Sequence, residues 1–512
     1  MVPTHRAGNV VANSLVVQVV TLPQGLGPLG SPGPMVCGSD SLFSGLTADS
    51  PPAHREEWPA SRTVMVGCVR RGRVACTSVC DSLFCYAVWP FGRTGLTVPY
   101  AEPGRFDVLA CHPGLDSGTQ GEARSTTVDV QIEEIALGDP RLKLFAELPW
   151  RLYRNDPCWT PPLRGDLLGS RVLGLSGLLT PNHPYHREAD VTHFLAWRDG
   201  VTVGRISAAI NRRFNEQHGC RIGSFGFFEV VEDYEVASAL LDRARNWVKE
   251  RGMTVLRGPG EYSNSTHERQ GILVDGFEYP PTVELTHNPP YYGEFMERYG
   301  FSKAMDYHAY IIDIQTPIPE ALKVLGERAK RRHNVTTRKA NLKELRSEVR
   351  LVARLFNEAW AENWGFLPLT DGEADAVADT LRPVIDPGLM RFAYVDGEPA
   401  AVLGALPDPN HALRPRWKWY GDSDLVRVAR LMWLRRHIPL IRLMFFGVPP
   451  RFRRMGIDGL LYAEVKEYAQ RRGYRQCEAS MLLEENYRII ASSEFMGGHR
   501  YKTWRIYDLP LD

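Results

Sequence analysis

Between about residue 127 and residue 512, the sequence presents one order of predicted elements twice. Each repeat predicts a helix, a hairpin, a strand, a long helix that ends in Arg-Gly, another strand, a helix that ends in glycine, and a last strand. The hairpin turns are Asp199-Gly200 and Asp396-Gly397, the Arg-Gly pairs are Arg251-Gly252 and Arg472-Gly473, and the later glycines are Gly300 and Gly497. A repeat this long predicts tandem domains, because solenoid repeats span only about 20–50 residues.

Local patterns support this order. The stretch VTHFLAWRDGVTVGRISAAINRRF, at 191–214, predicts two strands joined by an Asp-Gly turn. The stretch DYEVASALLDRARNWVKERG, at 233–252, predicts a helix, because its apolar residues recur on one face. In the second repeat, MRFAYVDGEPAAVLGAL predicts the matching hairpin, at 390–406.

The first 125 residues differ from the rest in composition. Their segments PQGLGPLGSPGPM and AEPGRFDVLACHPGLDSGTQGEARS are rich in glycine, proline and serine and show no sustained period. Such a stretch buries too little apolar surface to offset the entropy of ordering the chain. The sequence predicts a poorly ordered extension at 1–125, domains at 126–315 and 350–512, and a basic helical connector at 316–349. An over-extended start of the reading frame is an alternative explanation of the extension.

Composition places the chain among soluble globular proteins. Hydrophobic residues make up 44% and charged residues 24% of the sequence, and the formal net charge is +1. This balance gives no global electrostatic reason for binding nucleic acid or a membrane. No apolar run approaches the roughly 18 residues of a membrane span, and no secretion signal is recognisable. We therefore expect a cytoplasmic protein with no membrane span and no nucleic-acid partner.

Two basic stretches keep alternatives open. ERAKRRHNVTTRKANLK, in the connector, could bind RNA, although a solvated linker fits the balanced charge better. VRVARLMWLRRHIPLIRLM, at 426–444, is basic and apolar together, so a membrane surface or a long acyl chain could lie against it. We favour a helix along the wall of a cofactor site, with its arginines in water.

Neither the cysteines nor the histidines predict a metal site. Six of the nine cysteines lie before residue 125, and Cys76, Cys80 and Cys85 lack the spacing of a zinc ribbon. His183 and His186 are close in sequence, but no carboxylate or cysteine cluster accompanies them. We expect no metal, and reduced, buried thiols at the remaining cysteines.

A cluster of arginines lies between a predicted strand and a predicted helix, in VPPRFRRMGID at 448–458. A helix N-terminus presents unpaired backbone N–H groups and a partial positive charge. Gly456 would let a ligand approach the backbone closely. Three arginines would add charge at the rim: Arg451, Arg453 and Arg454. The pattern predicts an anion site suited to a pyrophosphate, with a solvated basic turn as the alternative.

The motif Arg453-x-x-Gly456-x-Asp458 resembles the phosphate loop Q/R-x-x-G-x-G/A of the GNAT superfamily of acyl-CoA-dependent acyltransferases. The order of elements after the loop also resembles that superfamily, over nearly all of 127–512 as two domains. The last position departs from the family pattern, since Asp458 would either cap the helix or repel the pyrophosphate. The resemblance implies an α/β (α+β) fold of two GNAT-like domains, each a mixed, mostly antiparallel sheet flanked by helices.

By this resemblance, the second repeat binds acetyl-CoA or another acyl-CoA as co-substrate and needs no metal. A backbone N–H group on the strand before the loop, near 446–448, would stabilise the oxyanion of the attacked thioester. The residues implied in cofactor binding are Phe446, Gly447, Val448, Arg451, Arg453, Arg454, Met455, Gly456, Ile457 and Asp458.

The family's proton donor is commonly a tyrosine four residues before the glycine that ends the last helix. Here that position holds Ser493, and the first repeat has Met296 there. Tyr487 lies on about the same helix face as Ser493, and two glutamates follow the preceding strand. The catalytic candidates are therefore Glu484, Glu485, Tyr487 and Ser493. The alternative is that these are helix-capping acids and a packing tyrosine.

The first repeat differs at the turn before its long helix, FGFFEVVEDYEVA at 225–237. Acidic residues at this turn suit the positive end of a helix dipole but exclude a phosphate. They are Glu229, Glu232, Asp233 and Glu235. We expect this repeat to lack the usual coenzyme A site and to shape the substrate cleft or support the fold. The long polar loop RGPGEYSNSTHERQG and the helix start NPPYY supply substrate-binding candidates. These are Tyr262, Asn264, His267 and Tyr292.

Together these features predict a tandem GNAT-like, acyl-CoA-dependent N-acyltransferase, in particular an N-acetyltransferase. Its acceptor would be a small-molecule amine that attacks the thioester directly. A catalytically degenerate protein that binds acyl-CoA or a partner is the alternative, favoured by Asp458 and the missing tyrosine. A nucleic-acid-binding protein that uses the basic connector is a third interpretation.

Overall fold

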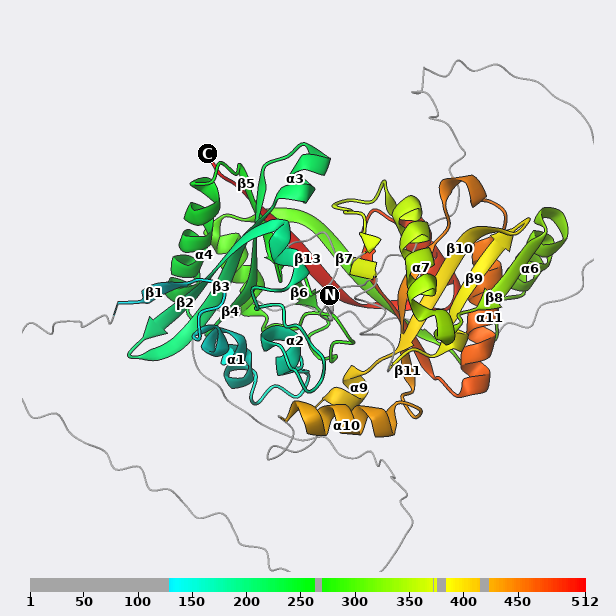
Figure 1. The fold of residues 1–512 in the computed structure, drawn as a ribbon, viewed down its shortest axis with the longest axis horizontal. Helices are drawn as coiled ribbons and strands as arrows, with labels where there is room; N and C mark the ends of the chain where they lie inside the picture. Colours follow the sequence, from blue (N-terminus) through cyan, green and yellow to red (C-terminus); the bar gives the residue numbers. More distant parts are fainter. Residues whose placement is uncertain (1–128, 263–268, 372, 375–383, 415–422) are drawn as a thin grey trace, which may run out of the picture. The chain divides into compact units, whose positions relative to one another are not determined.

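The computed structural model describes residues 129–262, 269–371, 373–374, 384–414 and 423–512 (Figure 1). The extension expected at 1–125 lies outside the described residues. The described residues all belong to a single structural unit. Among the helices that the structure describes, none combines the length and the apolar character that crossing a bilayer requires.

The first repeat forms the elements that its pattern predicts, in the predicted order. Its strands are β1 (Gln131–Ile135), β2 (Ala189–Arg198), β3 (Val201–Asn211), β4 (Ile222–Val230), β5 (Val255–Gly260), β6 (Ile272–Asp275) and β7 (Ser302–Asp313). Its helices are α1 (Leu142–Leu152), α2 (Arg164–Leu168), α3 (Arg212–His218), α4 (Tyr234–Lys249) and α5 (Tyr291–Tyr299). The pattern does not predict α2, α3 and β6, because each is too short to show a period.

The second repeat follows the same order. Its strands are β8 (Val335–Lys339), β9 (Met390–Val395), β10 (Glu398–Pro407), β11 (Leu440–Gly447), β12 (Gln476–Leu483) and β13 (His499–Pro510). Its helices are α6 (Glu320–His333), α7 (Leu345–Trp360), α9 (Asn410–Leu413), α10 (Asp424–Leu434), α11 (Ile457–Arg472) and α12 (Tyr487–Phe495).

The strands form one mixed sheet that runs through both repeats (Figure 1). Their order is β1-β2-β3-β4-β5-β13-β7-β12-β11-β10-β9-β8, and β6 pairs with β13 outside this path. Among these described strands, the pairs β4–β5 and β11–β12 are parallel and the others are antiparallel. The fold expected from the sequence, a mostly antiparallel sheet flanked by helices in each repeat, is confirmed.

The last strand of each repeat is exchanged with the other repeat. β13 lies between β5 and β7, with Asp508 opposite Arg257 on one side and Ser302 on the other. β7 in turn pairs with β12, where Ile312 lies opposite Cys477. In Figure 1, β13 (red) and β7 (green) run side by side through the middle of the sheet. The sequence does not reveal the exchange, because a strand keeps the same alternation whichever neighbour it has.

The stretch 316–349 is not the helical connector that its sequence predicts. It contains α6, β8 and the start of α7. β8 pairs antiparallel with β9, and Thr337 lies opposite Ala393. The β-branched residues of VTTRK favour a strand here, against the helix that the surrounding basic residues suggest. α6 packs on α11, where Gly326 lies against Leu460, so this stretch is part of the second repeat.

The two Asp-Gly hairpins are confirmed. Asp199 and Gly200 have φ angles of 52° and 72°, and Asp396 and Gly397 have φ angles of 49° and 84°. Positive φ at both central residues defines the type I′ turn, whose twist matches that of paired strands. The first turn joins β2 and β3, and β3 pairs with β4. The second turn joins β9 and β10, and β10 pairs with β11.

Both parallel pairs separate toward their C-terminal ends. β4 and β5 pair from Ile222 to Gly226, after which β4 continues to Val230. β11 and β12 pair as far as Leu443 and Ala479 and then diverge. Ligands of open α/β sheets commonly bind beyond the carboxyl ends of parallel strands, where neighbours part. The fold thus offers two places for a site, one in each repeat.

β4 also carries a bulge at its splayed end. Arg205 of β3 lies opposite Glu229, and Ser207 lies opposite Gly226. A single β3 residue between them therefore faces two β4 residues, Phe227 and Phe228. Phe227 has a φ angle of 48°, a conformation that costs a non-glycine residue about 1–3 kcal/mol. Bulges next to active sites redirect side chains in this way. The pairings of β11 and β12 are also irregular, and Met481 has a φ angle of 57°, so the bulge alone does not favour either repeat.

Candidate active site

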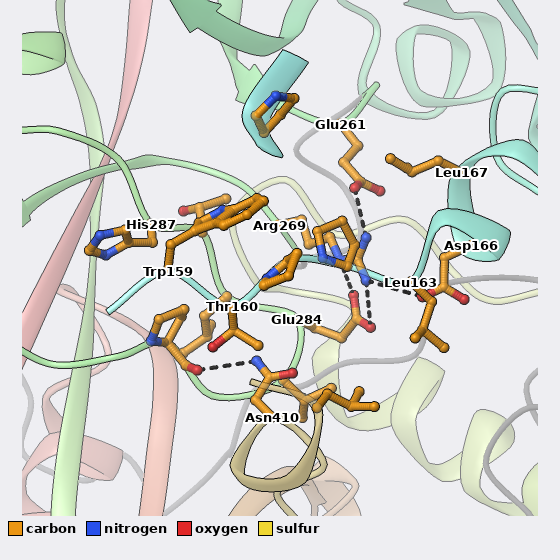
Figure 2. A pocket seen from close by; sticks show the side chains of 18 of the residues that line it. Trp159, Thr160, Leu163, Asp166, Leu167, Glu261, Arg269, Glu284, His287 and Asn410 are labelled. Carbon is orange, nitrogen blue, oxygen red and sulfur yellow. Dashed lines mark hydrogen bonds and ion pairs between the residues drawn. The ribbon is translucent and has the colours of Figure 1, made fainter. Parts of the chain in front are cut away.

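A cavity of about 700 Å³ lies at the splayed end of β4 and β5 (Figure 2). These strands and the residue after β5 contribute Phe227, Phe228, Glu229, Pro259, Gly260 and Glu261. The second repeat completes the wall with residues of α9 and α10. Pockets for organic ligands measure about 300–1,000 Å³, so this cavity can enclose a sizeable substrate.

Most of the cavity wall is apolar. It includes Trp150, Trp159, Leu163, Leu167, Leu175, Ile272, Leu285, Leu413, Val428, Leu431 and Met432. Trp159 stacks on Tyr153 with ring centroids 5.2 Å apart, and it meets Trp150 edge-on at 5.5 Å. Aromatic contacts of this kind fix side-chain positions, so this part of the wall is rigid.

Arg269 lies on the cavity wall and holds two carboxylates (Figure 2). Its Nη1 is 3.0 Å from Oε1 of Glu261, and its Nε is 2.6 Å from Oε2 of Glu284. Asp166 of α2 lies farther away, with Oδ2 at 4.0 Å from Nη2 of Arg269. All four side chains are mostly buried.

Within the Arg269 cluster itself, three carboxylates face one guanidinium; outside it, the charge of Arg427 acts on Asp166 and that of Arg205 acts on Glu261. Burial raises the pKa of Asp166 to about 7; Arg269 opposes the shift, and the neighbouring Glu284 adds to it. Burial also raises the pKa of Glu261. Carboxylates in excess over their cation attract a further positive charge. The cluster therefore suits a protonated amine.

A second polar cluster centres on Glu229, at the end of β4. Its Oε2 accepts hydrogen bonds from the hydroxyls of Tyr153 at 2.5 Å and Tyr292 at 2.9 Å. Arg205 lies 3.8 Å from the other oxygen, Oε1. The backbone N–H of Val230 donates to the Tyr292 hydroxyl at 2.8 Å. Burial raises the pKa of Glu229, against the opposing effects of Arg205 and the two tyrosines.

His287 forms a carboxylate–histidine pair with Asp156. Nε2 of His287 is 2.8 Å from Oδ2 of Asp156, and the imidazole lines the cavity. Burial alone would raise the pKa of Asp156, but the hydrogen bond and charge of His287 lower it on balance. The backbone N–H groups of Cys158 and Trp159 donate to the other carboxylate oxygen and hold it in place.

The second ring nitrogen of His287, Nδ1, is buried, and no described residue gives it a hydrogen-bond partner. When Nε2–H donates to Asp156, the neutral ring presents Nδ1 as an acceptor. That is the arrangement of a general base oriented by a carboxylate. In Figure 2, His287 and Asp166 lie on opposite sides of the view, with Arg269 and Glu284 between them.

The substrate-binding candidates of the first repeat occupy different places. Tyr292 lines the cavity and joins the Glu229 cluster. Tyr262 is buried, with its hydroxyl 2.7 Å from Nε2 of His193 and its ring edge-on to Phe227, which lines the cavity. Two candidates lie outside the described residues, Asn264 and His267.

The arginine-rich turn before α11 is engaged in contacts within the second repeat. Arg451 pairs with Glu358 and Glu398, and Arg453 donates to the backbone oxygens of Val448 and Ala359 at 3.3 and 3.2 Å. Arg454 is exposed and has a φ angle of 72°. Both arginines keep further N–H donors, so these contacts do not by themselves exclude a phosphate.

Gly456 and Asp458 begin α11. Gly456 is the N-cap, with a φ angle of 74° that favours glycine. A Cβ at this position would lie 3.0 Å from the backbone oxygen of Leu325, so α6 occupies the approach to the glycine. Asp458 lies in the first helical turn and does not cap the helix. Burial raises its pKa, against the effect of nearby backbone N–H groups.

The other cofactor-binding candidates are packed in the second repeat's core. Phe446 is 1% exposed, and its backbone oxygen accepts from Nε1 of Trp360 at 3.2 Å. Gly447 lies against Ala359, since a Cβ there would be 3.1 Å from that methyl group. The remaining three, Val448, Met455 and Ile457, lie in or against the same core.

The catalytic candidates of the second repeat lie in different environments. Glu484 accepts a hydrogen bond from Nζ of Lys303 at 2.6 Å. Glu485 and Tyr487 are exposed, Tyr487 at 75%. Ser493 is buried and lines a cavity of about 50 Å³. Pockets for organic ligands measure about 300–1,000 Å³, so this cavity is small for a ligand site.

The sequence does not point to the ionisable groups of the larger cavity. They are Asp156, Asp166, Glu261, Arg269, Glu284 and His287. They come from separate loops and from α2, so no spacing in the sequence joins them. His287 stands directly before NPPYY, and a polar loop residue before a helix start is the one local signal available. Within the described residues, no three His, Cys, Asp or Glu side chains are grouped so that they could hold a metal ion.

The strand order and the splayed parallel pair of each repeat define a tandem GNAT-like protein. Among solved structures, the chain resembles a tandem GNAT protein from the clavulanic acid biosynthesis pathway. The two are 13% identical with a TM-score of 0.45, over 75% of this chain and 99% of that one. That likeness is weak, and the class rests on the strand pairings. No protein-family model matches the chain.

Two relatives are similar over most of the chain. The bacterial ceramide synthase of Caulobacter vibrioides is 34% identical over 399 residues, which cover 76% of this chain and 99% of the relative. Protein YghO of Escherichia coli is 29% identical over 377 residues, which cover 72% of this chain and 92% of the relative. The chain belongs to the family of the bacterial ceramide synthase.

Proposed function

We propose that this protein is an N-acyltransferase that transfers a long acyl chain from a thioester to a long-chain amine. The observation that carries the proposal is the cavity of about 700 Å³, which joins apolar walls to ionisable groups at a bulged, splayed strand end. The name of the Caulobacter relative supports it, because a ceramide is the amide of a fatty acid and a long-chain amino alcohol. A cavity of this size and lining favours long chains over the acetyl group and small amine that the sequence predicts.

The Arg269 cluster is proposed to receive the amino group. An aliphatic amine is protonated at neutral pH, with a pKa near the value of about 10.4 for lysine. Three carboxylates around one guanidinium leave a net negative site for this ammonium. Asp166, whose pKa burial raises to about 7, can hold either the ammonium or its proton near neutral pH.

His287 is the proposed general base. The ammonium gives one proton to a carboxylate of the Arg269 cluster. The neutral amine then attacks the thioester carbonyl carbon and gives its second proton to Nδ1 of His287, which is buried in this structure and has to become accessible from the cavity. The new C–N bond forms, the C–S bond breaks, and the departing thiolate takes the proton from the His287 imidazolium. Backbone N–H groups at the β4 bulge, near Phe227 and Phe228, are proposed to stabilise the oxyanion between these steps.

The proposed acyl donor is acyl-CoA, as the family resemblance implies. In the structure, Arg451 and Arg453 contact partners within the second repeat. The departure of Asp458 and Ser493 from the family pattern favours a second candidate function, a protein that binds acyl thioesters without turning them over.

The two functions are distinguished by following thiol release and amide formation with the full chain. The substrates are acetyl-CoA or palmitoyl-CoA, each with sphinganine or a short-chain amine. We expect kcat/KM for palmitoyl-CoA with sphinganine to exceed that for acetyl-CoA with the short-chain amine by at least about tenfold. The reason is that each added methylene group gains binding energy against the apolar wall. Preference for acetyl-CoA and the small amine would contradict the proposed substrate class. Binding of palmitoyl-CoA without amide formation would support the second candidate.

A further inference from the structure

Helix α10 carries apolar side chains on its solvent side. Leu425 is 56% exposed, Val426 40%, Met432 41% and Trp433 77%. These positions recur at helical spacing and form one apolar stripe along the helix. A helix on the surface of a globular protein usually has the opposite orientation, with its apolar face in the core. The apolar stripe of α10 therefore faces outward and is not covered by the part of the chain that the structure describes.

The inward side of α10 is fixed by hydrogen bonds from arginines. Arg427 is 0% exposed and donates to the backbone oxygens of Leu413 at 3.0 Å and Pro162 at 2.9 Å. Arg430 donates to the backbone oxygen of Ala412 at 2.5 Å. The sequence-based expectation that these arginines lie in water is wrong for Arg427, because the carbonyl oxygens around it replace water. The same bonds hold the apolar stripe on the outside.

The apolar stripe adjoins the cavity. The lining includes Val428, Leu431 and Met432 of α10, and Leu173, Gly174 and Leu175 of the segment beside it. Met432 is both exposed and part of the lining, so the cavity reaches the surface next to the stripe. Val172 is 80% exposed. Asp424 joins the two segments, since its Oδ2 accepts from the backbone N–H of Gly165, which packs on Leu175.

Basic side chains flank the apolar stripe. Arg436 and His437 follow the end of α10 and are exposed, and Arg171 is exposed beside Val172. Positive charge next to exposed apolar side chains complements a bilayer with anionic headgroups. An exposed tryptophan such as Trp433 prefers the boundary between headgroups and hydrocarbon.

We propose that α10 and the segment around Val172 dock this protein on an anionic membrane surface. The apolar stripe enters the boundary of the acyl chains, and the basic side chains lie at the lipid phosphates. The cavity then opens toward the bilayer, where long-chain amphiphiles reside. This docking depends only on α10 and its surroundings, so it does not require the proposed reaction.

The test is flotation of the full chain with vesicles, read without any turnover. The vesicles are phosphatidylcholine with or without phosphatidylglycerol. The wild type is expected to float with the anionic vesicles and to be released by salt. The double variant Leu425→Asp/Trp433→Asp should lower the partition coefficient at least about tenfold, because two large apolar side chains no longer enter the bilayer. Arg436→Glu should lower it about fivefold or more.

Phe495→Asp is the matched control, because Phe495 is 54% exposed on α12, outside the cavity lining and the apolar stripe. It should float as the wild type does, and circular dichroism should show that every variant is folded. Failure of the wild type to float, or equal flotation of the double variant, would overturn the proposal. A dimer in solution that the double variant turns into a monomer, without vesicle binding by the wild type, would assign the apolar stripe to a second copy instead.

Discussion

His287 and Asp156 are the residues on which the proposed chemistry depends most directly. The ring of His287 is oriented through Nε2, which leaves Nδ1 buried in the cavity wall. An imidazole held in one tautomer by a carboxylate is a better base than one free to rotate, because its acceptor nitrogen is already in place. The role of Asp156 is therefore to position His287, not to touch the substrate.

Asp156→Asn should lower kcat by about 10²–10⁴-fold, because an amide favours the tautomer with the proton on Nδ1 of His287. KM for the amine should change little, since the Arg269 cluster that holds the ammonium is intact. Steady-state kinetics across pH would show this split. An unchanged kcat, or a loss confined to KM, would contradict the positioning role.

The burial of Asp166 predicts how the stability of the protein depends on pH. Burial raises its pKa to about 7, whereas an unfolded aspartate titrates near 3.9. The folded state therefore binds the proton more tightly, and its contribution to stability is lost as the pH rises from about 4 to about 7. Asp166→Asn should flatten this decline and leave the variant about 1–3 kcal/mol more stable than wild type above pH 7.

Urea unfolding at about pH 5 and about pH 8 measures this difference. Asp190→Asn serves as the control, because Asp190 lies on β2 with a side chain 58% exposed and is not among the residues that line the cavity. Its unfolding should keep the wild-type dependence on pH. The same dependence in Asp166→Asn would show that Asp166 does not titrate in the way that its burial implies.

Part of the site could be predicted from the sequence. Tyr292 was identifiable as a candidate, because prolines mark the helix start beside it and the loop before it is polar. His287, five residues before it, was not, because a single histidine in a loop has no pattern. The carboxylates of the Arg269 cluster form a candidate site only because folding buries them next to one another. Their spacing in the sequence does not predict that contact.

At the scale of elements, the exchange of β7 and β13 determines how the repeats are joined. Arg257 on β5 and Asp508 on β13 form a paired contact across this junction, Nε to Oδ1 at 2.8 Å and Nη2 to Oδ2 at 2.7 Å. Their side chains are 14% and 24% exposed. Arg257 also lies 4.6 Å over the ring of Trp364, in the second repeat. The junction is thus held by a partly buried ion pair as well as by strand pairing.

Arg257→Ala should lower the free energy of unfolding by about 1–3 kcal/mol, because it leaves the Asp508 carboxylate without its charged partner. Arg212→Ala is the matched control, since its ion pair with Asp190 is 46% and 58% exposed. Exposed pairs contribute about 0–1 kcal/mol. Denaturant unfolding compares the two variants. An equal loss of unfolding free energy in both would mean that the Arg257–Asp508 pair stabilises the fold no more than an exposed ion pair does.

Element prediction from sequence succeeded where one signal dominated. The hairpins were found because Asp-Gly selects their turn, and α4 was found because its apolar stripe has a helical period. β8 was missed because basic residues on both sides masked a short β-branched run. The helix expected in 426–444 is right only in part, because α10 ends at Leu434 and β11 begins at Leu440. The burial of Arg427 was also missed, since it depends on carbonyl oxygens of Pro162 and Leu413 that lie far away in sequence.

At the scale of the whole molecule, one sheet spans both repeats. We propose that the sequence repeats at 126–315 and 350–512 are two domains by descent that have become one folding unit through strand exchange. β5 without β13 would expose an unpaired sheet edge, which destabilises a fragment and promotes aggregation. The same exchange also brings α9 and α10 of the second repeat to the cavity of the first.

Fragments test this interpretation. Residues 126–315 alone and 316–512 alone should each fail to show cooperative unfolding, and a mixture of both should recover one transition, because β7 and β13 then regain their partners. Circular dichroism during urea unfolding would follow this. A cooperative transition of the first fragment alone would show that its sheet is complete without β13.

The central claim is that catalysis takes place in the cavity of the first repeat. Its most direct test compares amide formation by His287→Gln with that by Glu485→Gln, using palmitoyl-CoA and sphinganine. Glu485 is exposed and is one of the four catalytic candidates that the sequence gives in the second repeat. We predict that His287→Gln, still folded, loses at least about 100-fold in kcat while Glu485→Gln keeps the wild-type rate. Full activity of His287→Gln together with loss of activity in Glu485→Gln would contradict the account and return the active site to the second repeat.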